Sequence, residues 1–524
     1  MSIQGCLSFI IVFALAYTVQ GATFPIEEAT IAQLHAAYLT GRTTAREVTQ
    51  AYLDRIAAYD KRGPYLNALI TVNAGALAEA AKLDAALKST GRLVGPLHGI
   101  SVIVKDNIDT SDMPTSSGVA LFKDFRPPRD AFIVGRLRAA GAIILAKLSL
   151  SELAMGLADT INSVLPGFTR NPYNTAYASG GSSGGTGVAI AANFGTVGVG
   201  TDTGGSVRAP SSINNLVGIR PTVGLVSRTG MAPLDSQRDT PGPMARTLED
   251  AARLLDVIVG VDPADPRSAA AQTRIPPSYT AFLDKAGLKG SRIGVLRQAF
   301  KLQEGSDPRV ATLFETTIAD LRAAGAEIVD DFTVAGFERF PRPPQTAARS
   351  KADWENFFAY EGPTFPVKTV AELRDAPSGR AVHPLHAARV AEIAAVTKSP
   401  DEDPATVQGR KDEQMYRDAF GAAMDAARVD ALVFPVWTFP PKINGDRGQT
   451  PQGQLTFIGS ATQWPVVVVP MGFVDENLPI GFQFFGRPWT EGQLIRFAYA
   501  YEQLTHHRRP PPTAPPLAKP SRRR

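Results

Sequence analysis

Hydrophobic residues in the first sixty positions recur at the spacing of a helix face. One apolar stripe runs over residues 31–39 and follows Thr30, and a second runs over residues 48–56 and follows Thr44-Ala45-Arg46-Glu47. Threonine accepts hydrogen bonds from the unpaired N–H groups at a helix start, and a glutamate three residues later completes a capping box. The pattern therefore predicts two amphipathic helices. His35 lies on the apolar face of the first and is interpreted as a core residue.

Apolar runs and helical patterns then alternate. The turn at residues 95–99 leads into the mainly apolar run 100–104, and a helical pattern over residues 132–139 leads into the apolar run 141–145. Short apolar runs bounded by turn residues are typical of buried strands. Strands that alternate with helices indicate an α/β architecture.

The second half of the chain is predicted to complete the same domain. Residues 340–410 carry more proline and charge and less regular patterning, which fits an inserted substrate-shaping segment or a long surface excursion. The runs 466–469 and 480–486 predict two neighbouring buried strands, and residues 494–504 predict a closing helix. Because no repeat or linker interrupts the chain, we expect one compact α/β domain.

The N-terminal segment has the length of a signal-peptide apolar core. Residues 7–17 are mostly apolar, Val19 and Gly21 suit a cleavage site, and no Lys or Arg precedes them. The run is too short to span a bilayer. We expect residues 1–22 to be a signal peptide and the mature protein to be exported. Without cleavage the segment is an apolar helix on the domain, and the protein is cytoplasmic.

The cysteine content limits which structural and catalytic sites the protein can have. The one cysteine, Cys6, lies in this segment, so the cleaved protein has no disulfide, no cysteine metal site and no cysteine nucleophile. The formal net charge of +4 is small and includes the basic residues 507–509 and 522–524, which predicts no nucleic-acid partner. The Pro-rich and Arg-rich tail, residues 510–524, is predicted to be disordered.

A Gly/Ser block occupies residues 179–187 and leads directly into the apolar run 188–192. A flexible linker is one interpretation, but a loop that opens a buried helix more often holds a group against backbone N–H groups. No lysine follows the glycines as a phosphate-binding P-loop requires, which makes phosphate binding the weaker interpretation.

A second glycine-rich turn reads Thr203-Gly204-Gly205-Ser206. Glycines before a serine let the backbone turn sharply and direct several N–H groups at one point, as an oxyanion hole requires. A serine at the end of such a turn is exposed enough to attack a carbonyl. Taken alone, the motif also fits a tight turn with a capping serine.

A serine nucleophile needs a base. None of the six histidines lies in a recognisable Ser-His-Asp or metalloprotease arrangement. Lys105 directly follows the predicted strand 100–104. A lysine at a strand end is usually solvated, but burial beside the serine loops would lower its pKa and make it a usable base.

Together these motifs resemble the amidase signature family. The resemblance runs from about residue 31 to residue 509. It rests on Val-Lys-Asp-Asn around Lys105, Gly-Gly-Ser-Ser-Gly-Gly at 180–185 and Gly-Thr-Asp-Thr-Gly-Gly-Ser-Val-Arg at 200–208, with further agreement at 95–99, 220–222 and 242–246. It implies a single domain over residues 25–509, with a central mixed β-sheet flanked by helices.

The resemblance also implies a Ser-Ser-Lys triad that needs no metal or cofactor. Ser206 would attack the amide carbonyl, and Ser182, in a cis peptide, would connect it to Lys105 as base. The other implied site residues are Thr203, Gly204 and Gly205 in the oxyanion hole, with the N–H of Ser206; Ser183, Asp202 and Arg208 as supports; and Met155 and Gly156 at the acyl pocket.

The chain looks most similar to stand-alone bacterial amidases, including those that deamidate peptide C-termini. We therefore expect an amidase acting on a small-molecule or peptide amide, with no membrane span. One alternative is the glutaminase subunit of a tRNA-dependent amidotransferase, which an export signal disfavours. Another is hydrolysis of an ester, carbamate or anilide at the same site. A third, a binding or scaffold protein without turnover, is disfavoured by the intact triad. The preferred amide and the oligomeric state stay open.

Overall fold

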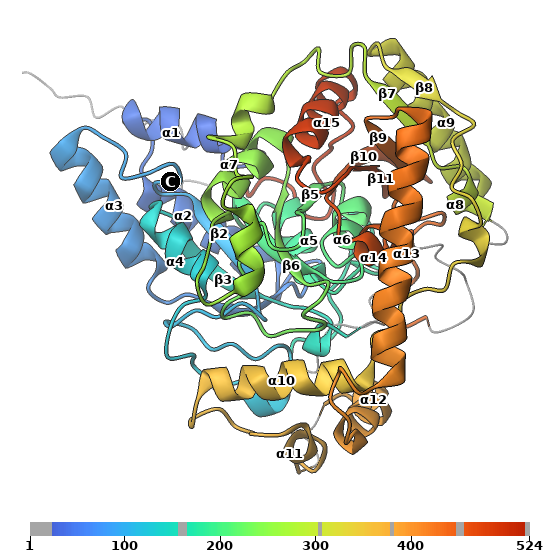
Figure 1. Ribbon diagram of the computed structural model, residues 1–524. Coiled ribbons are helices and arrows are strands. Elements are labelled where there is room, and N and C mark those ends of the chain that lie inside the picture. Colours follow the sequence, from blue (N-terminus) through green and yellow to red (C-terminus); the bar gives the residue numbers. More distant parts are fainter. Residues whose placement is uncertain (1–23, 156–164, 302–305, 378–381, 447–454, 519–524) are drawn as a thin grey trace, which may run out of the picture.

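Eleven strands from the described residues form one mixed β-sheet (Figure 1). The computed structural model describes residues 24–155, 165–301, 306–377, 382–446 and 455–518. In spatial order the strands are β1 (Leu69–Val72), β3 (Ile143–Leu148), β2 (Ser101–Lys105), β4 (Val197–Asp202), β6 (Thr240–Ala245), β5 (Val217–Arg220), β10 (Val466–Val474), β11 (Leu478–Phe485), β9 (Ala431–Pro435), β7 (Arg292–Val295) and β8 (Glu327–Val329). The predicted fold class is confirmed.

The direction of the central strands positions the chemistry. β2 pairs in parallel with both β3 and β4, whereas β4 pairs antiparallel with β6. All positions of β2, β3 and β4 are buried, as strands covered on both faces require. The carboxyl ends of β2 and β4 therefore meet at one edge of the sheet. Lys105 and Asp202, the last residues of these strands, lie at that edge.

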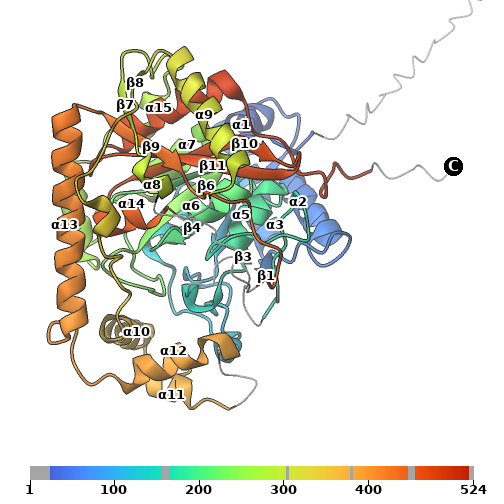
Figure 2. The same ribbon diagram turned by 90° about the vertical axis from the view of Figure 1, so that its right-hand side faces the viewer.

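Helices cover both faces of this sheet (Figures 1 and 2). The helices outside residues 340–427 are α1 (Ile31–Leu39), α2 (Ala45–Tyr59), α3 (Ala76–Thr90), α4 (Phe132–Ala139), α5 (Gly184–Ala191), α6 (Arg208–Ile213), α7 (Leu248–Ile258), α8 (Gln298–Lys301), α9 (Pro308–Ala323), α14 (Phe457–Thr462) and α15 (Glu491–Thr505). Both capping boxes at Thr30 and Thr44 form. The predicted helix over 132–139, the paired late strands and the closing helix are likewise confirmed.

Residues 340–410 form a helical layer at one end of the molecule rather than an irregular excursion. It contains α10 (Ala347–Glu361), α11 (Val370–Arg374), α12 (Pro384–Ala395) and the start of the long α13 (Pro404–Ala427). Figures 1 and 2 show α10, α11 and α12 apart from the sheet, with α13 running from them up the side of the domain. The layer packs through a cluster that includes Phe122, Trp354, Phe358 and Phe365. Aromatic burial of this kind fixes its position on the domain.

The C-terminal tail corrects one prediction. Over residues 510–518 the chain is ordered against α2, where Arg55 donates to the carbonyl of Ala514 at 2.6 Å and to that of Pro515 at 3.0 Å. The Tyr59 hydroxyl also donates to Pro515, at 2.8 Å. Proline lacks an N–H donor but keeps its carbonyl acceptor, so a Pro-rich segment can still dock on a buried arginine. Residues 519–524 lie outside the described part of the chain.

The predicted signal peptide, residues 1–22, also lies outside the described residues. Within the described residues, no helix combines the length and apolar character that crossing a membrane requires.

The start of α5 has no room for any side chain at Gly185. A Cβ there would lie 2.5 Å from the carbonyl oxygens of Ala68 and Ser149, and these are backbone atoms that cannot rotate away. We predict that Gly185→Ala lowers the free energy of unfolding by about 3 kcal/mol. Urea unfolding followed by circular dichroism measures the change.

The matched control is Gly135→Ala, in the interior of α4, where a Cβ would meet nothing within 4 Å. It should raise the free energy of unfolding by up to about 1 kcal/mol, because alanine favours helix over glycine. Equal stabilities of the two variants would contradict the packing argument.

Candidate active site

Lys105 ends β2 inside the domain, with no exposed surface. Its Nζ donates to Ser182 Oγ at 2.7 Å and to Thr201 Oγ1 at 2.8 Å. Burial lowers the pKa of Lys105 to about 7, although the carboxyl groups of Asp239 and Asp202 partly oppose this shift. Near neutral pH, therefore, a substantial fraction of this lysine is uncharged and can accept a proton.

Ser182 lies in the Gly/Ser loop that precedes α5. The Gly181–Ser182 peptide bond is cis, as the resemblance implied, and the carbonyl of Ser182 accepts from the Ser151 N–H at 3.1 Å. The next residue, Ser183, donates its hydroxyl to the Thr201 carbonyl at 3.2 Å and accepts from the Thr201 N–H at the same distance. Ser183 thus fastens the Gly/Ser loop to β4.

Ser206 lies at the end of the second glycine-rich turn, 8% exposed. Its carbonyl accepts from the Ser183 N–H at 3.2 Å, which joins the two serine loops. Gly205 has φ +128°, and a Cβ on it would lie 2.2 Å from Thr456 Oγ1, so only glycine fits. The hydrogen bonds of the described residues run from Lys105 to Ser182 and do not continue to the Ser206 hydroxyl.

Asp202 anchors this turn. Its carboxylate lies 2.9 Å from Arg208 Nη2 and 2.7 Å from Arg220 Nη1, and all three side chains are fully buried. It also accepts from the N–H groups of Gly205 at 3.0 Å and Val207 at 3.1 Å. The two arginines hold the pKa of Asp202 well below its usual range, against the effect of burial. The structure thus brings Asp202 and Arg208, the two residues predicted as supports, into direct contact at the serine turn.

The bond from Gly205 to Asp202 bears on the predicted oxyanion hole, because it uses one of the backbone donors of the turn. The charged carboxylate attracts the Gly205 N–H, so this donor is directed at Asp202 and not into the site. Thr203 and Gly204 lie in the same turn. The Thr203 hydroxyl donates to Asp239, a buried residue that the sequence reasoning did not single out.

Asp239 is held by the loop that precedes it. Its Oδ2 accepts from the N–H groups of Leu234 at 2.9 Å and Asp235 at 3.0 Å, and burial raises its pKa to about 7. The sequence around it, Gln-Arg-Asp-Thr-Pro at 237–241, does not predict that Asp239 supports the serine turn. The contact with Thr203 joins residues far apart in the chain, so no local pattern indicates it.

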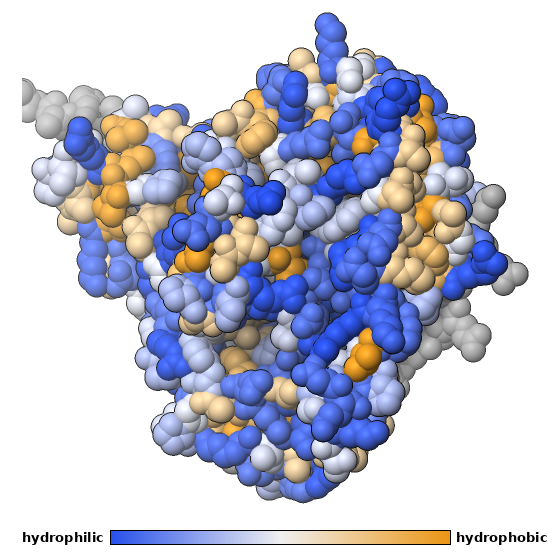
Figure 3. Space-filling model, viewed as in Figure 1, coloured by the Kyte–Doolittle hydropathy of each residue, from blue (hydrophilic) through white to orange (hydrophobic). Residues whose placement is uncertain are grey.

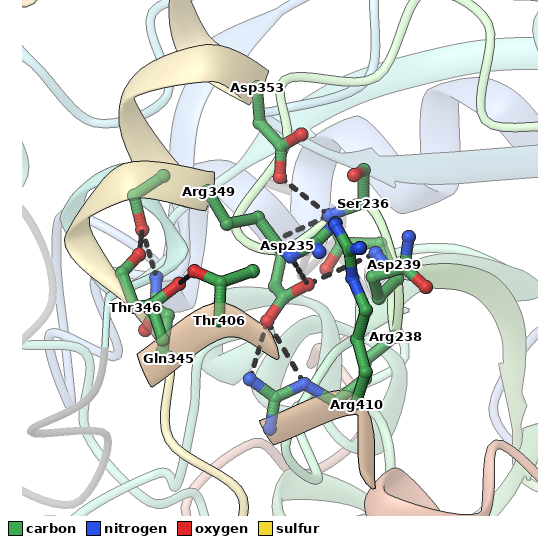
Figure 4. A network of polar contacts seen from close by, with 12 residues as sticks. Asp235, Ser236, Arg238, Asp239, Gln345, Thr346, Arg349, Asp353, Thr406 and Arg410 are labelled. Atoms are coloured by element: carbon green, nitrogen blue, oxygen red, sulfur yellow. Dashed lines mark hydrogen bonds and ion pairs between the residues drawn. The ribbon is translucent and has the colours of Figure 1, made fainter. Parts of the chain in front are cut away.

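The same loop is fastened to the helical layer (Figure 4). Asp353 on α10 accepts from the Ser236 N–H at 2.8 Å, and Gln345 donates to the Leu234 carbonyl at 2.9 Å. Arg238 donates to Asp235 at 3.0 Å. Through these contacts, the helical layer at residues 340–410 holds the loop that supports the serine turn.

A cavity lies between this layer and the end of β2. The nine residues that line it are mostly apolar or aromatic: Asn107, Ser117, Phe122, Leu153, Ala232, Pro233, Trp354, Phe357 and Phe358. Pro233 and Phe357 also line an open cleft bordered by Asp239 and Asp353, so the cavity and the cleft are neighbours. Figure 3 shows this face hollowed between the body of the domain and the helical layer.

The predicted acyl-pocket residues are placed only in part. Met155 is buried in the aromatic cluster with Phe122, Trp354 and Phe358, but it is not among the residues that line the cavity. Gly156 lies outside the described residues. In the part of the chain that the structure describes, no group of three or more His, Cys, Asp or Glu residues could hold a metal ion.

The chain is similar in sequence and in structure to known amidases and to an amidotransferase subunit. Residues 47–495 match the Amidase family model. The chain is 34% identical to a glutamyl-tRNA(Gln) amidotransferase subunit from Thermosynechococcus vestitus, covering 92% of this chain and 99% of that protein. It is 38% identical to the native peptide amidase structure from Stenotrophomonas maltophilia, with a TM-score of 0.81 and coverage of 93% and 99%.

A third similar protein is an amidase family protein from Bacillus anthracis. Its crystal structure is 31% identical, with a TM-score of 0.79 and coverage of 93% of this chain and 92% of that one. The family match spans most of the chain, and the solved structures share its eleven-stranded architecture closely enough to align almost throughout. The chain belongs to the amidase signature family and is a hydrolase of carbon–nitrogen bonds in amides.

Proposed function

We propose that this amidase works through an acyl-enzyme on Ser206, with Ser182 and Lys105 as its proton relay. The observation that carries the proposal is the buried Lys105 Nζ, 2.7 Å from Ser182 Oγ and with its pKa lowered to about 7. A lysine in this state can serve as a general base at neutral pH. Ser182 can pass a proton because a hydroxyl both donates and accepts.

The proposed steps follow from this arrangement. Ser206 Oγ attacks the amide carbonyl while its proton passes to Ser182 and the Ser182 proton passes to neutral Lys105. The relay then reverses and protonates the leaving nitrogen, so the C–N bond breaks and ammonia or an amine departs. Water, activated by the same relay, attacks the acyl-enzyme and releases the acid. The Ser206 hydroxyl must turn toward Ser182 for the first step; such contacts often tighten only when substrate binds.

The oxyanion in this proposal is held by backbone N–H groups of the turn. We keep Thr203, Gly204 and Ser206 as donors, and we assign Gly205 the separate task of holding the turn on Asp202. Preorganised donors in a dry site stabilise the developing charge strongly. Asp202, Arg208 and Ser183 act by fixing the turn and the Gly/Ser loop.

For the substrate, we propose a small-molecule or peptide amide whose apolar part enters from the open cleft. The open cleft, which Pro233 and Phe357 line, and the 38% identity to a peptide amidase support this. The glutaminase alternative is favoured by the 34% identity to the amidotransferase protein. A panel of C-terminal peptide amides, with glutamine as the comparison, separates the two. The glutaminase alternative would be favoured if ammonia were released from glutamine but from none of the peptide amides, or if activity required further subunits.

We further propose that the protein is exported after cleavage of residues 1–22. The apolar run at 7–17 and the small residues Val19 and Gly21 support this. Mass spectrometry of the protein from its native cells tests it. A mature N-terminus near residue 22 is expected, and an intact Met1 in a cytoplasmic fraction would contradict it.

We predict that Ser206→Ala lowers kcat by a factor on the order of a million, as loss of a nucleophile does in other hydrolases. A fluorophosphonate should add once to the wild-type protein and not to Ser206→Ala, as read by intact-protein mass spectrometry. Ser89→Ala, an exposed serine on α3, is the control and should label and turn over as wild type does. Labelling of Ser206→Ala would place the nucleophile elsewhere.

We also predict that kcat/KM rises with pH through about 7, the pKa of Lys105. Because the uncharged amine is the base, kcat/KM increases as the lysine loses its proton. Lys105→Arg should be inactive from pH 6 to pH 9, because a guanidinium stays protonated. Initial rates on one amide across this range measure both effects. A flat profile for the wild type, or an active Lys105→Arg variant, would rule out Lys105 as base.

A further inference from the structure

The geometry points to a substrate contact that neither the triad nor the oxyanion hole provides. We propose that Asn107 Oδ1 accepts a hydrogen bond from an N–H group of the substrate and so favours amides over esters. This inference rests on the proposed function, since it assigns a specificity-determining contact at the same site.

The orientation of the Asn107 carboxamide is fixed by its neighbours. Its Nδ2 donates to the carbonyl of Ala232 at 3.1 Å and to Thr201 Oγ1 at 3.2 Å. A backbone carbonyl can only accept, so the NH2 end of the carboxamide must face Ala232. The backbone reinforces this position, because the Ala232 N–H donates to the Asn107 carbonyl at 2.8 Å. Oδ1 is therefore the end that points away from both partners.

Oδ1 is buried and has no hydrogen-bond partner among the described residues. Asn107 is 2% exposed. Leaving a buried acceptor without a donor is unfavourable, and such groups in folded proteins are usually satisfied by a ligand or an ordered water. Asn107 is also one of the residues that line the cavity beneath the helical layer. The acceptor is thus placed where a bound molecule can supply the missing donor.

The cavity limits what that donor can be. Apart from Asn107 and Ser117, its lining is apolar or aromatic, and its free volume of about 10 Å³ is close to what one water-sized group needs. An amide NH2 or N–H fits such a space and supplies the donor. An ester oxygen fits the same space but has no hydrogen to donate, and it would leave Oδ1 unpaired.

The contact would lie beside the proton relay. Lys105 Nζ and Asn107 Nδ2 donate to the same Thr201 hydroxyl, at 2.8 Å and 3.2 Å. A substrate N–H bound to Oδ1 is therefore separated from the lysine only by Thr201 and one carboxamide group. Two groups of a peptide-like amide could supply this N–H: the leaving NH2 of the carboxamide, or the N–H on the α carbon of the acyl part.

The test compares three substrates that differ in these donors: N-acetylphenylalanine amide, its methyl ester, and 3-phenylpropanamide. The variant is Asn107→Leu, which keeps the approximate shape and removes the acceptor. If the leaving NH2 binds Oδ1, kcat/KM should fall roughly 10-fold or more for both amides, with a much smaller loss for the ester. If both N-acetyl substrates fall together and 3-phenylpropanamide does not, the α N–H is the donor, and the proposed preference for amides over esters is overturned.

The control is Asn214→Leu. Asn214 is also buried with an unpartnered Oδ1 and donates to two backbone carbonyls, of Ser179 and Pro210, but it does not line the cavity. It should change all three rates by one common factor. If Asn107→Leu fails to fold, as judged by thermal unfolding, Asn107→Ala is measured in its place.

Equal losses on all three substrates for the Asn107 variant, or no loss, would overturn the proposal and leave Asn107 as a brace for Thr201 with water on Oδ1. Failure of the proposed function gives a different result: the wild-type protein would then hydrolyse none of the three substrates.

Discussion

The ion cluster at Asp202 is the constraint on which the active site depends. One carboxylate holds Arg208 and Arg220 and accepts from the backbone of the serine turn. Arg208 extends the cluster to α14 by donating to the carbonyl of Thr456 at 2.6 Å. Strand ends, a turn and a helix from distant parts of the chain thus share one buried charge. Breaking such a cluster by removing one partner typically costs about 3–5 kcal/mol, because a charge is left buried and unpaired.

Two buried lysines at the same edge of the sheet differ in the groups that surround them, and this difference bears on which of them can act as a base. Lys147 on β3 lies 3.1 Å from Asp106 Oδ1 and donates to Thr115 at 2.6 Å. Lys105 on the neighbouring β2 has hydroxyl partners, and among the described residues no carboxylate lies within ion-pair distance of it. An adjacent carboxylate favours the charged lysine, whereas hydroxyls in a dry site compensate the charge poorly. The same residue type is therefore paired with a carboxylate in one strand and is the proposed base in the next.

Local patterns in the sequence were enough to predict much of the fold, and they supplied the residues of the proposed triad. Capping boxes, apolar runs and the two glycine-rich motifs each lie within about ten residues, and the family resemblance joined Lys105 to Ser182 and Ser206. The errors concern contacts that no local pattern encodes. The tail at 510–518 docks because Arg55, far back in the chain, needs carbonyl acceptors. The position of the helical layer at residues 340–410 likewise depends on a distant residue, because the layer packs against Phe122. The Gly205 N–H is a different case, because it faces the carboxylate of Asp202 only three residues earlier in the same turn.

The docked tail also has a consequence for the order in which the domain can be completed. Arg55 is 1% exposed, and two of its acceptors are the carbonyls of Ala514 and Pro515. Since a ribosome makes the chain from its N-terminus, this guanidinium exists for nearly the whole of synthesis before those acceptors do. Before the tail is made, Arg55 can bond to Glu27 and to the carbonyls of Ala192 and Asn193. Water is expected to solvate the part of the guanidinium that the tail later covers, because a buried cation with too few acceptors is unfavourable. Docking of residues 510–518 is therefore expected to be a late step in folding, one that completes the burial of Arg55.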